Sequence, residues 1–114
     1  MTNLLKDKIV VVTGANRGIG KCITEIFAAN GANIIACIRI ITPESEKWMK
    51  NLEQKFNIYI NTVTLDLSDE KSVKDSIKQI FSISKKIDVL VNNAGVASGA
   101  LFQMTPIPEL RKIF

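Results

Sequence analysis

A glycine-rich stretch near the N-terminus has the residue types and the spacing of a phosphate-binding loop. Its glycines follow the pattern Gly-x-x-x-Gly-x-Gly, between an apolar run over residues 9–12 and a helical pattern that begins near residue 19. Glycine permits positive φ and a close backbone approach, and a helix N-terminus offers free N–H groups and a positive dipole end. Three glycines alone fit a tight turn equally well, but the flanking strand and helix favour a dinucleotide site. The predicted cofactor-binding residues here are Gly14, Ala15, Asn16, Arg17, Gly18, Ile19 and Gly20.

Polar residues also follow two later apolar runs, over residues 58–65 and 87–91. In an open parallel sheet a ligand binds at the carboxyl ends of the strands, so we expect these residues to share one crevice with the glycine loop. Taken singly, the first group could be only a helix cap and the second only a turn. The predicted cofactor-binding residues here are Asp66, Leu67, Asn93, Ala94 and Gly95.

The hydrophobic pattern alternates between short β-branched runs and amphipathic helices. It predicts strands over residues 9–12, 34–38, 58–65 and 87–91, separated by three helices. Strands and helices in this order predict a parallel sheet with right-handed crossovers and helices on both faces. The expected buried stripes are Ile19, Cys22, Ile23, Ile26 and Phe27 in the first helix, Trp48, Met49, Leu52 and Phe56 in the second, and Val73, Ile77, Ile80 and Phe81 in the third.

These motifs together resemble those of the short-chain dehydrogenases/reductases, and most closely the 3-oxoacyl-acyl-carrier-protein reductase group. The resemblance rests on Thr13–Gly20, Asp66-Leu67, Asp88 before Val89-Leu90-Val91, and Asn92-Asn93-Ala94-Gly95, in that order. It implies an α/β fold, a Rossmann-type doubly wound parallel sheet that is incomplete, with four strands in the order 3-2-1-4. It also implies that Asp66 binds the adenine amino group, and that residues 93–95 lie along the cofactor ribose and support the sheet.

The resemblance further implies an oxidoreductase that transfers hydride between nicotinamide C4 and the carbonyl or alcohol carbon of a small molecule, in a homo-oligomeric full-length protein. A carboxylate that ends the second strand normally favours NAD by bonding the ribose 2′-OH. Here Ile38 and Arg39 occupy that place, and Arg17 adds a second positive charge. Because a guanidinium suits a phosphate, we predict that NADP (NADPH) is preferred over NAD; the alternative is that Arg39 is a solvent-facing charge.

The active-site pair of this family, Tyr-x-x-x-Lys, is not found in the sequence. The only tyrosine is Tyr59, four residues before Val63, so no catalytic residue is predicted. We therefore expect residues 1–114 to be the N-terminal cofactor-binding half of such a domain, without its catalytic half. A non-catalytic nucleotide-binding module and an inactive truncated fragment are the alternatives. The last strand, residues 87–91, would then be an exposed aliphatic edge that promotes self-association.

The composition argues against a nucleic-acid-binding protein and against a membrane-spanning protein. The chain has 114 residues, 46% of them apolar, a net charge of +4 and no histidine. Six lysines are interleaved with acids along two predicted helices, so a nucleic-acid partner is not expected; they are Lys47, Lys50, Lys55, Lys71, Lys74 and Lys78. The longest aliphatic run, residues 9–12, is too short for a membrane span. Cys22 and Cys37 match no metal or disulfide spacing and are expected to pack as small apolar groups in a cytoplasmic protein.

Overall fold

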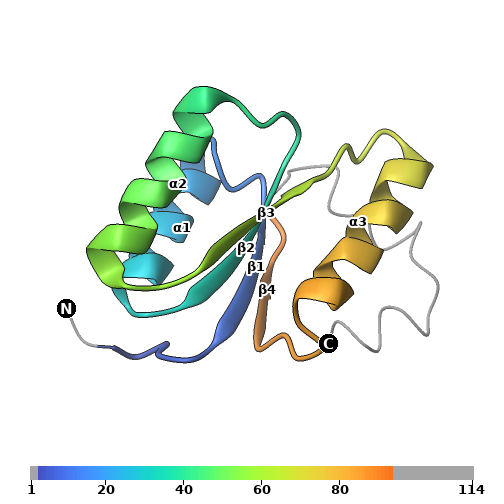
Figure 1. Ribbon diagram of the computed structural model, residues 1–114. Helices are drawn as coiled ribbons and strands as arrows, with labels where there is room; N and C mark the ends of the chain where they lie inside the picture. Colours follow the sequence, from blue (N-terminus) through green and yellow to red (C-terminus); the bar gives the residue numbers. More distant parts are fainter. Residues whose placement is uncertain (1–2, 94–114) are drawn as a thin grey trace.

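The computed structural model describes residues 3–93, which form one parallel sheet covered by helices on both faces (Figure 1). The strand order β3-β2-β1-β4 is the one that the family resemblance implied. Helices α1 and α2 cover one face, and α3 covers the other (Figure 1). The elements are β1 (Ile9–Thr13), α1 (Gly18–Ala29), β2 (Asn33–Ile38), α2 (Pro43–Phe56), β3 (Ile60–Thr64), α3 (Glu70–Ile83) and β4 (Val89–Val91). Ala94, Gly95 and the weakly periodic stretch over residues 101–114 lie outside the described residues.

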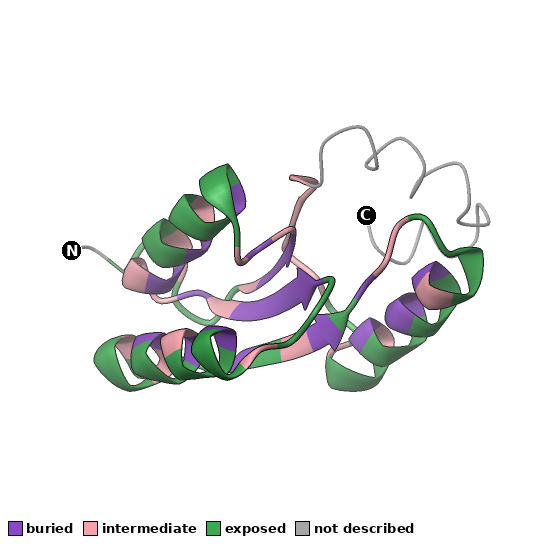
Figure 2. Ribbon diagram, turned by 90° about the horizontal axis from the view of Figure 1, so that it is seen from above, coloured by how far each residue is buried: buried purple, intermediate pink, exposed green. Residues whose placement is uncertain are grey.

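The central strands are apolar on both faces because both faces are covered. Alternate residues of β1 enter different core clusters: Val10 and Val12 face α1 and α2, whereas Val11 faces α3. Neighbouring β2 follows the same alternation, since Val11 is paired with Ile35 in the parallel register. Burial is accordingly densest along the middle strands and on the inner sides of the helices (Figure 2). This double burial explains why the strands appear in the sequence as continuous β-branched runs.

The second and third helices bury the stripes that their periodicity predicts. Met49 and Leu52 of α2 are buried, with Trp48 and Phe56 packed against the same cluster. In α3 the buried residues of the stripe are Val73, Ile77 and Ile80, and Phe81 packs at their margin.

The predicted buried stripe of α1 is largely wrong. Ile19 is 71% exposed and Ile26 is 55% exposed, while Cys22 is also exposed. The side of α1 that meets the sheet consists instead of Gly20, Thr24 and Ala28. Small residues let this helix approach β1 closely, and that contact decides which face is buried. Ile19 and Ile26 are consequently turned outward, whereas Phe27 of the predicted stripe packs against the core.

The edge strand β4 is shorter and less exposed than predicted. Val89, Leu90 and Val91 are each half-buried, because they pack against the two core clusters. Within residues 3–93 no strand pairs with the outer side of β4.

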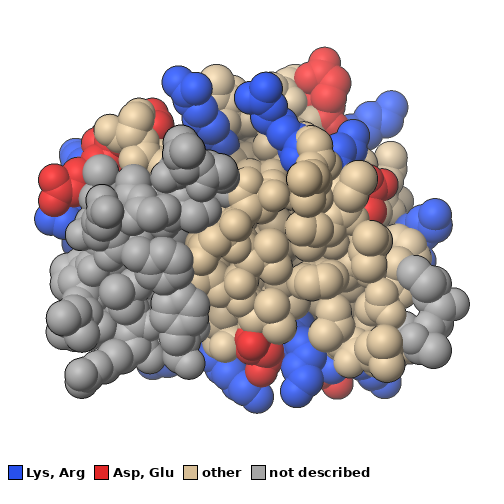
Figure 3. All heavy atoms as spheres, turned by 180° about the vertical axis from the view of Figure 1, so that it is seen from behind, with Lys and Arg blue, Asp and Glu red and all other residues tan. Residues whose placement is uncertain are grey.

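On the reverse side of the molecule, charged side chains lie mainly along the upper and lower margins, with an uncharged area between them (Figure 3). No helix in the described part of the chain is long and apolar enough to cross a membrane.

Candidate dinucleotide-binding site

A cleft of about 500 Å³ opens at the carboxyl ends of β1, β2 and β3. This volume lies within the range of about 300–1,000 Å³ that is typical of small-molecule sites. The cleft brings three segments together that are distant in the sequence: the glycine loop, the end of β2 and the start of the β3–α3 connection. Its lining residues are Gly14, Asn16, Arg17, Cys37, Arg39, Leu65, Asp66, Leu67 and Ser68.

Two glycines of the loop have backbone conformations that other residues rarely adopt. Gly14 has φ 63° and Gly18 has φ 50°. The N–H of Gly14 donates to the carbonyl oxygen of Cys37 at 2.9 Å, which ties the loop to β2. Gly20 is needed for a different reason, since a Cβ there would collide with the Gly14 carbonyl and the Asn93 side chain. The loop therefore requires glycine both for its turn and for close packing.

The start of α1 presents a row of backbone N–H groups toward this loop. Among the described residues, the N–H groups of residues 16–20 donate no hydrogen bond, and the first to do so is that of Lys21, to the Arg17 carbonyl at 3.2 Å. Arg17 occupies the N-cap position without a side-chain capping bond, and the first turn has no acidic residue. Free N–H groups and an uncompensated helix dipole together favour an anion at this point.

Two threonines that are not among the predicted cofactor-binding residues hold the loop in place. The Thr13 hydroxyl donates to the Val91 carbonyl at 3.3 Å and accepts from the Asn93 N–H at 2.9 Å. Thr24 donates to the Gly20 carbonyl at 2.7 Å. Thr13 thus joins the ends of β1 and β4. Its hydrogen bond to the Asn93 N–H also holds the Asn93 side chain beside Gly20. The sequence offered one indication of the role of Thr13, which is that this polar residue directly follows the apolar run over residues 9–12.

Asp66 lines the cleft two residues after the end of β3. Its Oδ1 accepts hydrogen bonds from the Ser68 hydroxyl at 2.6 Å and from the Ser68 N–H at 3.0 Å. These two bonds, with a smaller effect of Arg39, hold the pKa of the Asp66 carboxyl below its ordinary value. The carboxylate is therefore ionised at neutral pH and acts only as an acceptor.

Neither arginine of the cleft is held in an ion pair in the described part of the chain, although Arg39 lies near enough to Asp66 to help lower the pKa of its carboxyl. Neither Arg17 nor Arg39 forms an ion pair there; the two ion pairs are Lys74–Glu70 and Lys86–Asp88. Both arginines are exposed and line the same cleft. Their charges are thus available to an anionic ligand.

The remaining predicted residues lie around the cleft rather than in its lining. Ala15 is buried within the loop and Gly20 is buried in the first turn of α1, Ile19 is exposed at the start of α1, and Asn93 lies beside Gly20. No group of three or more histidine, cysteine, aspartate or glutamate side chains that could hold a metal is found within residues 3–93.

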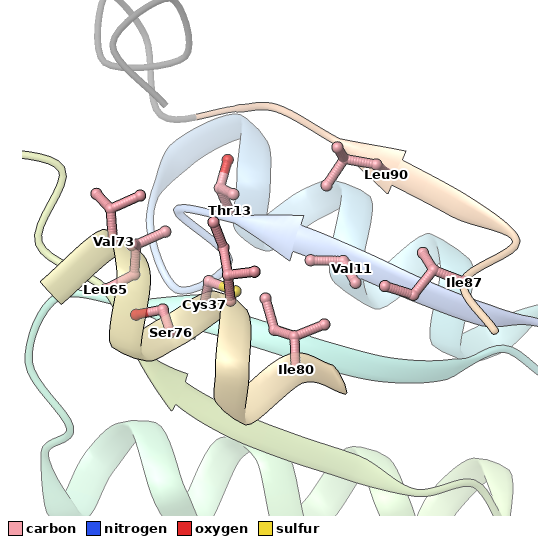
Figure 4. Close-up of a pocket in the computed structure, with 10 residues that line it drawn as sticks. Val11, Thr13, Cys37, Leu65, Val73, Ser76, Ile80, Ile87 and Leu90 are labelled. Carbon is pink, nitrogen blue, oxygen red and sulfur yellow. The ribbon is translucent and has the colours of Figure 1, made fainter. Parts of the chain in front are cut away.

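A second, apolar pocket lies between α3 and the sheet (Figure 4). Its volume is only about 30 Å³, and side chains such as Val11, Val73 and Ile80 surround it. Burial raises the pKa of the Cys37 thiol beside it to about 12, so this cysteine stays protonated. The pocket is an imperfection in core packing that is far too small for a nucleotide.

A glycine loop before an uncapped helix, at the carboxyl ends of parallel strands, defines a nucleotide-binding α/β fold. The sequence model of the short chain dehydrogenase family matches residues 8–114, and the chain belongs to this family. An uncharacterized oxidoreductase of Thermotoga maritima is 33% identical over 96% of this chain and 42% of its own length. The NADPH-dependent 3-dehydrocapnine reductase of Ornithobacterium rhinotracheale is 36% identical over 92% of this chain and 36% of its own length.

The solved structures of this family share the fold. The alcohol dehydrogenase of Thermococcus sibiricus, complexed with 5-hydroxy-NADP, is 30% identical and superimposes with a TM-score of 0.66 over 73% of this chain and 35% of its own. The L-sorbose reductase of Gluconobacter frateurii, complexed with NADPH, is 24% identical and has a TM-score of 0.75 over 99% of this chain and 47% of its own. The chain thus spans less than half the length of these relatives.

Proposed function

We propose that this chain is the cofactor-binding part of an NADP(H)-dependent short-chain oxidoreductase. The single observation that carries this proposal is the cleft itself. It combines two arginines that form no ion pair among residues 3–93 with the glycine loop and the uncapped start of α1. Each feature matches one anionic or polar part of the cofactor.

The pyrophosphate of the cofactor lies, in this proposal, against the glycine loop. The N–H groups of residues 16–20 have no acceptor in the described part of the chain, and phosphate oxygens supply acceptors. Gly14 and Gly18 keep this backbone open to the ligand, and the close contact of Gly20 fixes α1 against the sheet. The positive end of the α1 dipole adds further attraction.

The adenine base lies between β2 and β3, against Asp66 and Leu67. An ionised carboxylate accepts a hydrogen bond from the adenine amino group, and a backbone N–H can donate to the neighbouring ring nitrogen. Leu67 lines the cleft, and its N–H has no partner among residues 3–93. Acceptor and donor therefore stand next to each other, as the amino edge of adenine requires.

The preference for NADP over NAD is assigned to Arg39, with support from Arg17. Arg39 directly follows β2, where a carboxylate would bond the 2′-OH of NAD and repel a phosphate. A guanidinium presents a planar set of donors that matches the three oxygens of a 2′-phosphate. The resulting charge favours the phosphorylated ribose.

The test is the ratio of NADPH to NADH affinity, measured by titration calorimetry on the chain and on Arg39→Ala. We expect the chain to prefer NADPH, and the substitution to reduce that preference about tenfold, because it removes a charge-assisted contact to the 2′-phosphate. Lys50→Ala, an exposed position on α2, removes the same charge outside the cleft and should leave the ratio unchanged. An unchanged ratio in Arg39→Ala would refute the assignment.

We assign no residue of the range 3–93 to the hydride-transfer step. Tyr59, the only tyrosine, precedes β3 and therefore lies at the amino ends of the strands, whereas the cleft lies at their carboxyl ends. It is 74% exposed and its N–H donates to Asn33. This placement also favours the second candidate function, a nucleotide-binding module without catalysis, which would bind NADPH and reduce no carbonyl compound.

The proposal extends to the full-length protein. A full-length protein of this kind would reduce a small carbonyl compound, or oxidise the corresponding alcohol, as a homo-oligomer with residues 1–114 as its cofactor-binding half. Both cysteines of the chain are free thiols, which is consistent with the reducing cytoplasm.

A further inference from the structure

We infer that Ser68 is a positioning residue for adenine recognition, because it fixes which oxygen of Asp66 faces the base. This inference rests on the proposed function, in which Asp66 accepts from the adenine amino group. It extends that function by naming the group that makes the carboxylate selective.

The geometry around Asp66 is asymmetric. Both hydrogen bonds from Ser68, through its hydroxyl at 2.6 Å and its N–H at 3.0 Å, go to Oδ1. Oδ2 accepts no hydrogen bond from any residue that the structure describes. A free carboxylate rotates about its last side-chain bond and presents either oxygen. Here Ser68 occupies one oxygen and leaves the other to the ligand.

The backbone on either side of the carboxylate is held as well. The N–H of Asp66 donates to the Ser72 hydroxyl at 3.0 Å, and its carbonyl accepts from the Asp69 N–H at 3.1 Å. These bonds join the end of β3 to the first turn of α3. Asp66, which lines the cleft, thus has a held backbone, an Oδ1 bound by Ser68 and an Oδ2 without a partner among residues 3–93, which is the pre-organisation that a directional contact needs.

The test uses NADPH and its deamino analogue, in which hypoxanthine replaces adenine. The analogue presents a carbonyl oxygen in place of the amino group, so an oriented Asp66 should discriminate against it. We expect the chain to bind NADPH about tenfold more tightly than the analogue. In Ser68→Ala this ratio should fall by about three- to fivefold, since the carboxylate loses its orientation. Ser68→Thr keeps the hydroxyl and should restore the ratio.

Two controls separate orientation from general damage. Ser82→Ala removes an exposed hydroxyl that also donates at 2.6 Å, to the Gln79 carbonyl near the far end of α3, and it should leave the ratio unchanged. Asp66→Ala should abolish the discrimination altogether. Far-ultraviolet circular dichroism of each variant checks that the fold is retained.

The outcomes distinguish the inference from the function on which it rests. Discrimination lost in Asp66→Ala but unchanged in Ser68→Ala would overturn the role of Ser68 and leave the adenine site standing. Discrimination unchanged in Asp66→Ala, or no binding of NADPH by the chain, would overturn the proposed adenine site and the inference with it. A ratio that falls equally in Ser68→Ala and Ser68→Thr would show a packing effect, which also contradicts the inference.

Discussion

Helices α1 and α2 each follow a strand through a short loop at the same end of the sheet, yet their first turns are built in opposite ways. In α2 the Thr42 hydroxyl accepts from the Ser45 N–H at 3.1 Å, and the Ser45 hydroxyl accepts from the Thr42 N–H at 2.9 Å. Pro43 and two glutamates complete that turn. The first turn of α1 has no capping side chain and no acid.

The capped start of α2 stabilises the fold, whereas the uncapped start of α1 leaves N–H groups that a ligand can bind. A capping box satisfies two N–H groups at the helix start internally, here those of Thr42 and Ser45, and a cap is worth about 1 kcal/mol. The start of α1 forgoes this stabilisation and keeps its N–H groups free for a ligand. The uncapped start of α1 is accordingly the helix start at which we propose that the cofactor pyrophosphate binds.

The largest effect is expected from Gly20→Ala, which fills the space under the start of α1. The new Cβ would collide with the Gly14 carbonyl and the Asn93 side chain. We expect a loss of about 3 kcal/mol in the free energy of unfolding, measured by urea denaturation, together with loss of NADPH binding. Gly18→Ala is the matched control: its Cβ would meet no atom within 4 Å, so only the strain of φ 50° remains, about 1 kcal/mol. Equal effects of both substitutions would contradict the packing role of Gly20.

A smaller effect is expected when the start of α1 receives an acidic residue and the start of α2 loses its cap. Ile19→Glu supplies α1 with the acid that its first turn lacks. It should raise the free energy of unfolding by about 0.5 kcal/mol and weaken NADPH binding about tenfold, because a carboxylate repels the pyrophosphate. Thr42→Ala should lower the free energy of unfolding by about 1 kcal/mol and leave NADPH affinity unchanged. Denaturation and calorimetry on both variants measure the two quantities, and a fall in affinity in Thr42→Ala alone would reverse the assignment.

The smallest effect concerns the amino ends of the strands, where polar groups are paired within the protein. Asp88 accepts from the Ile9 N–H at 2.8 Å, and this bond, more than nearby Lys86 and Lys8, holds the pKa of its carboxyl below the ordinary 3.8. A lowered pKa in the folded state stabilises the fold above the unfolded value. That contribution is lost as the pH falls below 3.8 and through the folded pKa. Denaturation as a function of pH should therefore show a shallower acid limb for Asp88→Asn; an unchanged limb would exclude this role.

Much of the fold was predictable because the strands are buried on both faces. Continuous runs such as residues 9–12 leave little choice of element, and Thr42-Pro43 marks the start of α2. The buried face of α1 was mispredicted because its contact with the sheet depends on Gly20 and Thr24, small residues that hydrophobic periodicity does not weigh. The roles of Thr13 and Ser68 were missed for a related reason: single hydroxyls identify a position only when their partners across the fold are known.

The most direct test of the central claim is a titration of the isotopically labelled chain with NADPH, followed by amide nitrogen–proton NMR. We expect large shifts for the amides of residues 16–20 at the start of α1, with little change for the amides of residues 44–46 at the capped start of α2. Saturable binding that leaves residues 16–20 unshifted, or that shifts both helix starts alike, would contradict it.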